Sequence, residues 1–61
     1  MIINCTIDTA AFINTVMIEE DGVFIVETMD ELAPIGDDCV AYWRGDDRQL
    51  AWAEYDRQCS L

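Results

Sequence analysis

The sequence contains no lysine and no histidine, and its only basic side chains are those of Arg44, Arg48 and Arg57. Without histidine the chain lacks the commonest general base and metal ligand, and without lysine it lacks a Schiff-base amine. Binding to nucleic-acid phosphates needs clustered cations, which three arginines do not provide. We therefore expect neither an enzyme nor a protein that binds nucleic acid directly.

Long apolar runs are missing as well. No stretch approaches the roughly 18 apolar residues of a membrane span, and the first residues, Met1 to Asn4, lack the positive charge that opens a signal peptide. The single proline and three glycines form no linker. We expect one domain over residues 1–61, a location in the cytoplasm, and no contact with a membrane.

Cysteine is present only as Cys5, Cys39 and Cys59, an odd number at wide spacing and without a CxxC pair. This pattern supports neither a disulfide framework nor a zinc site, so we expect three buried, reduced thiols. The acidic pairs do not alternate as calcium-loop ligands do. No metal and no cofactor are expected.

Thirteen Asp and Glu residues are abundant by contrast, and they give the 61-residue chain a formal charge of −10. With 52% apolar residues the chain can still form a core. A net charge of about two to eight is enough for solubility, and further repulsion weakens a small fold. The excess acidity therefore indicates either a function or adaptation to a saline cytoplasm.

The first half of the chain predicts a strand followed by a hairpin. Ile2 to Ile7 reads as a strand, and Asp8 is placed to cap a short helix over Thr9 to Asn14. Two β-rich runs, Thr15 to Glu19 and Val23 to Thr28, flank the sequence Glu-Asp-Gly. Asp-Gly between such runs is a strong hairpin signal because both central positions need a positive φ.

In the second half, Met29 to Gly36 predicts a turn of helix followed by a loop, because its proline and glycine cannot continue a helix, and Cys39 to Arg44 predicts a strand. Strong helix formers from Asp47 to Ser60 indicate a helix, with a second hairpin as the rival interpretation. The expected fold is α+β, with a small antiparallel sheet of three to four strands and one or two short helices.

The acidic residues fall in groups at predicted turns, so they can form a negative surface like that of a nucleic-acid backbone. Such a surface would fit the basic channel of a protein that handles DNA or RNA, while the plain alternative is a solvated surface. Trp43, next to a predicted turn, is a candidate aromatic anchor. The candidate partner-binding residues are Glu19, Glu20, Asp21, Asp30, Glu31, Asp37, Asp38, Trp43, Asp46 and Asp47.

In size, charge and expected compartment the chain resembles the small acidic proteins that phages and mobile elements direct against bacterial nucleases. These are the anti-CRISPR proteins and the anti-restriction proteins that mimic DNA. The resemblance covers the whole chain but includes no motif. It implies a stoichiometric inhibitor that acts in the cytoplasm of a bacterial host and blocks the DNA-reading channel of a CRISPR effector or restriction complex.

Two other functions fit the same residues. An antitoxin-like or adaptor protein would bind a basic protein partner through its aromatic and acidic surface. An acidic housekeeping domain of a salt-adapted host would need no such partner. Charge mimicry predicts binding that weakens steeply with salt, whereas an adaptor that binds through apolar contacts should tolerate salt.

Overall fold

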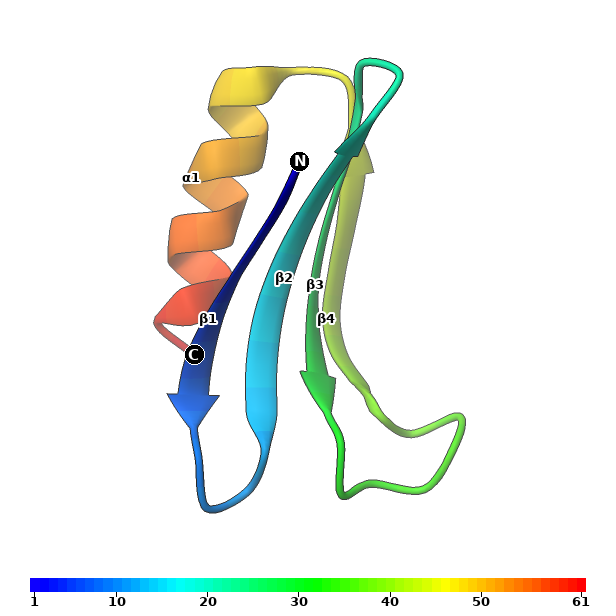
Figure 1. Cartoon of the computed structure of the whole chain (residues 1–61), viewed down its shortest axis with the longest axis vertical. Coiled ribbons are helices and arrows are strands. Elements are labelled where there is room, and N and C mark those ends of the chain that lie inside the picture. The colour runs from blue at the N-terminus through cyan, green and yellow to red at the C-terminus, as the bar shows by residue number, and fades with distance from the viewer.

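A computed structural model describes all 61 residues and contains four strands followed by one helix (Figure 1). The strands form one antiparallel sheet in the order β1-β2-β3-β4, and the helix packs against one face of it. The expected α+β class is confirmed, with four strands and a single helix. The elements are β1 (Ile2–Asp8), β2 (Ile13–Glu20), β3 (Val23–Asp30), β4 (Cys39–Gly45) and α1 (Arg48–Cys59).

The predicted hairpin joins β2 to β3. Asp21 and Gly22 have φ values of 53° and 78°, which are the positive values that a two-residue turn of this kind requires. Glu20 pairs with Val23 directly beside the turn, and the pairing continues without a bulge to Ile13 and Asp30. This part of the sequence prediction is confirmed.

The short helix predicted over Thr9 to Asn14 is wrong. Asp8 accepts hydrogen bonds through Oδ1 from the amides of Ala10 at 3.0 Å and Ala11 at 3.3 Å, as a cap would, but the chain then turns back. Ile13 already belongs to β2, where it pairs with both Asp8 and Asp30. A helix of one turn is marginal by itself, so pairing with two neighbouring strands outweighs the helix preference of the alanines.

Within Met29 to Gly36 the predicted turn of helix is also wrong, whereas the loop predicted to follow it is present. Met29 and Asp30 extend β3, and turns follow them. Asp30 Oδ1 accepts from the Leu32 amide at 3.1 Å, and the Pro34 carbonyl accepts from the Asp37 amide at 2.9 Å. The strand continues because Ile13 and Asn14 of β2 pair with its last two residues.

The C-terminal helix is confirmed, and the rival hairpin is wrong. Asp47 caps α1: its Oδ1 accepts from the amides of Gln49 at 2.9 Å and Leu50 at 3.1 Å. A carboxylate at this position satisfies amides that lack a partner within the helix and complements the helix dipole. Ala51, Tyr55 and Gln58 point from α1 into the protein.

The apolar core lies between α1 and the helix-facing side of the sheet. It consists of Met17, Phe24, Val26, Ala51 and Tyr55, and Trp43 packs against it from β4. The Trp43 ring lies over Gly45, where an added Cβ would come within 2.7 Å of the ring atoms Cη2 and Cζ2. Because glycine has no Cβ, Gly45 leaves room for the Trp43 indole ring.

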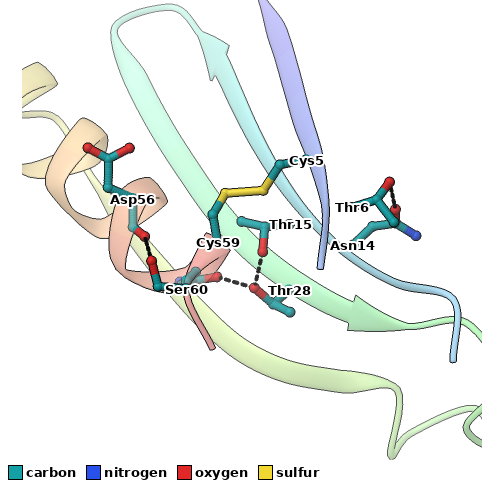
Figure 2. The surroundings of a disulfide bond; sticks show 9 residues. Cys5, Thr6, Asn14, Thr15, Thr28, Asp56, Cys59 and Ser60 are labelled. Atoms are coloured by element: carbon teal, nitrogen blue, oxygen red, sulfur yellow. Dashed lines mark hydrogen bonds between the residues drawn. A yellow bond between two sulfur atoms is a disulfide. The ribbon is translucent and has the colours of Figure 1, made fainter. Parts of the chain in front are cut away.

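Three fully buried polar side chains cross this core. The hydroxyls of Thr15 and Thr28 are hydrogen-bonded at 2.7 Å, and Thr28 donates to Gln58 Oε1 at 2.9 Å (Figure 2). Gln58 Nε2 donates to the Val26 carbonyl at 3.3 Å and to Glu54 Oε2 at 2.8 Å. This network satisfies every buried polar side-chain atom and fixes α1 on the sheet.

The expectation of three buried, reduced thiols is wrong. Cys5 and Cys59 form a disulfide between β1 and the last turn of α1, with a Cα–Cα distance of 6.4 Å (Figure 2). Cys39 is free and exposed. Residues 54 positions apart meet because α1, which packs mainly over β2 and β3, brings its last turn to β1 at the sheet edge, an arrangement that cysteine spacing alone does not show.

Candidate protein-binding surface

The meander places the connections between strands at two opposite ends of the sheet, and ten of the thirteen carboxylates lie there (Figure 1). One end holds the β2–β3 turn and the β4–α1 connection. We call it the hairpin end, with Glu19, Glu20, Asp21, Asp46 and Asp47. The other holds the β1–β2 turn and the β3–β4 loop. We call it the acidic end, with Asp8, Asp30, Glu31, Asp37 and Asp38.

The two ends differ in net charge. Arg44 and Arg48 belong to the hairpin end, and the N-terminal amine donates to the Glu19 carbonyl nearby at 3.2 Å. No arginine lies in the segments that form the acidic end. The one salt bridge of the protein joins Arg57 to Glu54 within α1, so it neutralises neither end. The strongest negative charge is therefore at the acidic end.

A backbone hydrogen bond joins the two connections of the acidic end: the Glu31 amide donates to the Phe12 carbonyl at 3.1 Å. A second bond, from the Asp30 amide to the Asp38 carbonyl at 2.7 Å, closes the base of the β3–β4 loop. Neighbouring strands lie about 4.8 Å apart, so both connections lie close together at one end of the molecule.

Exposed apolar side chains accompany these carboxylates. Phe12 is 51% exposed, Leu32 67% and Ile35 101%. Phe12 also has a φ of 56°, a value unusual for any residue with a bulky side chain. Large exposed apolar groups beside charges are typical of surfaces that bind other proteins. The acidic end thus combines charge for attraction with apolar groups for contact.

The predicted site residues are divided by the fold. Asp30, Glu31, Asp37 and Asp38 come together at the acidic end, whereas the other six lie at the hairpin end or, for Trp43, half-buried against the core. The Asp47 carboxylate is engaged in capping α1. Trp43 is held by its packing on the helix side of the sheet.

Sequence reasoning missed Asp8 and the three exposed apolar residues of the acidic end. The sequence predicts only a capping role for Asp8, because the predicted helix takes the place of the turn that leaves Asp8 at the same end of the sheet as the β3–β4 loop. The sequence does contain a signal for the exposure of Leu32 and Ile35. They flank Pro34 in a segment that cannot form a helix or a strand, and side chains in such a loop are mostly exposed.

Glu54 of α1 lies outside both ends. Glu54 accepts hydrogen bonds from Arg57 and Gln58, and these bonds, led by that from Arg57, hold its pKa below the usual value despite partial burial. No group of three or more carboxylates or cysteines is arranged to hold a metal ion. The helix is too short and too polar to cross a membrane.

By its fold the chain is an α+β domain in which a four-stranded antiparallel meander carries one C-terminal helix, closed by a disulfide to the first strand. Comparisons of the chain with protein-family models, with curated proteins and with solved structures found no match.

Proposed function

We propose that this protein is a stoichiometric inhibitor of a nucleic-acid-binding protein, of the CRISPR-effector or restriction type, and that its acidic end occupies the basic channel of the target. The observation that carries the proposal is the group of five carboxylates in two hydrogen-bonded connections that contain no cation. The inhibitor needs no cofactor and catalyses no reaction.

The density of charge supports mimicry of a nucleic-acid backbone. The molecule measures 31 × 21 × 16 Å, so its end spans at most 21 Å. Duplex DNA carries one charge per about 1.7 Å, so the same length presents about twelve phosphates, of which about six face one side. Five carboxylates at the acidic end come close to that number.

The proposed location, a bacterial cytoplasm, keeps thiols reduced, whereas the Cys5–Cys59 bond belongs to an oxidising environment. An inhibitor that acts in the cytoplasm therefore has to fold there as a dithiol. Binding to the target stabilises the folded form by mass action and can supply part of the stability that the bond gives. The proposal is accordingly tested with and without reductant.

The test measures cleavage of duplex DNA by a panel of purified CRISPR effectors and restriction enzymes in the presence of increasing amounts of this protein, with and without a reductant. We expect stoichiometric inhibition of at least one member, relieved by excess duplex DNA. Asp37→Lys at the acidic end should weaken inhibition by roughly tenfold or more, because it turns attraction into repulsion.

The matched control is Asp56→Lys, an equal change of charge at an exposed position of α1. It should leave inhibition within about threefold of the unmodified protein, since it lies outside the acidic end. Inhibition that responds equally to both changes would show that only net charge matters. If no enzyme of the panel were inhibited, the proposed function would be refuted.

An adaptor or antitoxin-like protein is the second candidate, and the exposed side chains of Phe12, Leu32 and Ile35 favour it. Such a protein would bind a basic partner chiefly through apolar contacts. Its affinity would then fall sharply in Ile35→Ser, change little with salt, and leave the partner free to bind DNA.

A further inference from the structure

One face of the sheet is left uncovered by the fold. Side chains alternate across a strand, and α1 packs against the face that carries Met17 and Val26. The opposite face has nothing over it, yet it is rich in large apolar side chains. They include Ile2, Val16, Ile18, Val23, Ile25 and Tyr42.

This composition differs from that of a sheet face turned to water. Solvated faces of antiparallel sheets carry mostly polar residues. Here the register aligns Ile2 with Ile18, Ile18 with Ile25 and Ile25 with Arg44, so one row of three isoleucines and an arginine crosses all four strands. Ile2 is 75% exposed and Tyr42 57%. Such a contiguous apolar surface is typical of an interface.

The charges on the open face favour a second copy of this chain as its occupant. Glu27 of β3 lies within the face, and Arg44, which makes no salt bridge, lies on the adjacent strand. Glu20, which pairs with Val23 beside the turn, adds a second carboxylate to this face. In a two-fold pair Arg44 of each copy can therefore face a carboxylate of the other copy, as a self-complementary interface requires. A strongly basic partner would instead be drawn to the two ends, where ten carboxylates lie.

The shape of the open face is also self-complementary. A hollow of about 250 Å³ is lined by Ile18, Val23 and Ile25, with Arg44 on one side and the carboxylates of the hairpin on the other. The exposed side chains of Ile2 and Tyr42 project from the same face. In a two-fold pair each copy offers both a hollow and projecting groups to the other.

The size of the face suits a modest dimer. Strands of seven or eight residues are about 25 Å long, and four strands span about 19 Å, so the flat footprint is about 475 Å² for each copy. Two copies then bury on the order of 1,000 Å² or more, once side-chain relief is included, which is the lower limit of specific interfaces. Interfaces of this size are typical of weak, transient association.

We propose that two copies of this chain stack their open sheet faces to form a homodimer, with both acidic ends left free in solvent. This inference goes beyond the proposed inhibition and does not depend on it. Added salt should have opposite effects on dimer formation and on binding to the inhibited target. Repulsion between two chains of charge −10 opposes the dimer, so added salt strengthens it, whereas binding of a basic target weakens.

Sedimentation velocity of the oxidised protein between about 1 and 200 μM tests the proposal. We expect a monomer–dimer equilibrium that shifts toward dimer when NaCl rises from 50 to 500 mM. Ile25→Lys should weaken the dimer about 100-fold, because each of the two copies loses one buried isoleucine. Ile2→Lys, at an exposed edge position where the fold tolerates a lysine more readily, serves as a second variant.

The control is Ile35→Lys, the same substitution at a fully exposed loop position away from the open face. It should leave the dimer intact, and circular dichroism should show that all three variants are folded. A protein that stays monomeric at 200 μM and 500 mM NaCl would overturn the proposal. A dimer that survives both Ile25→Lys and Ile2→Lys would also overturn it, because the contact would then lie at a sheet edge or an end.

Discussion

Reduction of the Cys5–Cys59 disulfide should remove about half or more of the stability of this domain. The bond closes a loop with a sequence separation of 54 residues between the first strand and the end of the helix. In the chain-entropy description a loop of that length stabilises the folded state by about 4 kcal/mol. The whole free energy of unfolding of a 61-residue domain is about 3–9 kcal/mol.

The loss of the disulfide should have a large effect because few other contacts hold the two ends of the chain together. Only five apolar side chains form the buried core. The disulfide joins β1, a sheet edge, to the last turn of α1, so cutting it frees an edge strand and a helix terminus together. The dithiol protein should therefore be much less stable than the oxidised protein.

Thermal unfolding followed by circular dichroism, with and without a reductant, measures the effect. We expect the midpoint to fall by about 15 °C or more, since 1 kcal/mol corresponds to at least about 4 °C in a domain of this size. The double variant Cys5→Ser/Cys59→Ser should behave like the reduced protein. Cys39→Ser, at the exposed free thiol, is the control and should unfold like the oxidised protein. Midpoints within about 3 °C for the oxidised, reduced and double-variant forms would refute the reasoning.

Three further substitutions test the packing of α1. Asp47→Ala removes the helix cap and should cost about 1 kcal/mol in urea unfolding, and a change below about 0.3 kcal/mol would contradict the capping role. Gln58→Ala should cost about 2–3 kcal/mol, because the buried groups of Thr28 and Val26 lose a partner, and an unchanged urea midpoint would contradict this. Since the pKa of Glu54 is lowered by folding, its ionisation contributes stability that is present above the unfolded value of about 4.3 and is lost as pH falls through the lowered pKa. The stability difference between the original protein and Glu54→Gln should therefore shrink below about pH 4, and a difference independent of pH between 3 and 7 would contradict it.

Short sequence motifs correctly predicted the elements whose conformation depends on a few neighbouring residues. Asp21-Gly22 determined the hairpin because its turn needs two positive φ values, and Asp47 with the helix formers after it determined α1. The two predicted helical turns, at Thr9 to Asn14 and at the start of Met29 to Gly36, are wrong because strand pairing overrides local preference at one end of each. Ile13 and Asn14 pair there with Asp30 and Met29, and no short window of residues contains both strands.

The candidate site was only partly predictable for the same reason. The grouping of Asp30, Glu31, Asp37 and Asp38 follows from their nearness in sequence, whereas the addition of Asp8 and Phe12 requires the register of β1 with β2. Prediction of the disulfide requires still more information, because the bond depends on the order of the strands and on the direction of α1 across the sheet.

The salt dependence of binding to an inhibited nuclease tests the central claim most directly. With the oxidised protein and its target, we expect the affinity to fall steeply between 50 and 300 mM NaCl, and duplex DNA to compete for the same site. An affinity that is unchanged over this range, or simultaneous binding of DNA and this protein, would contradict the assignment of the acidic end to a basic channel.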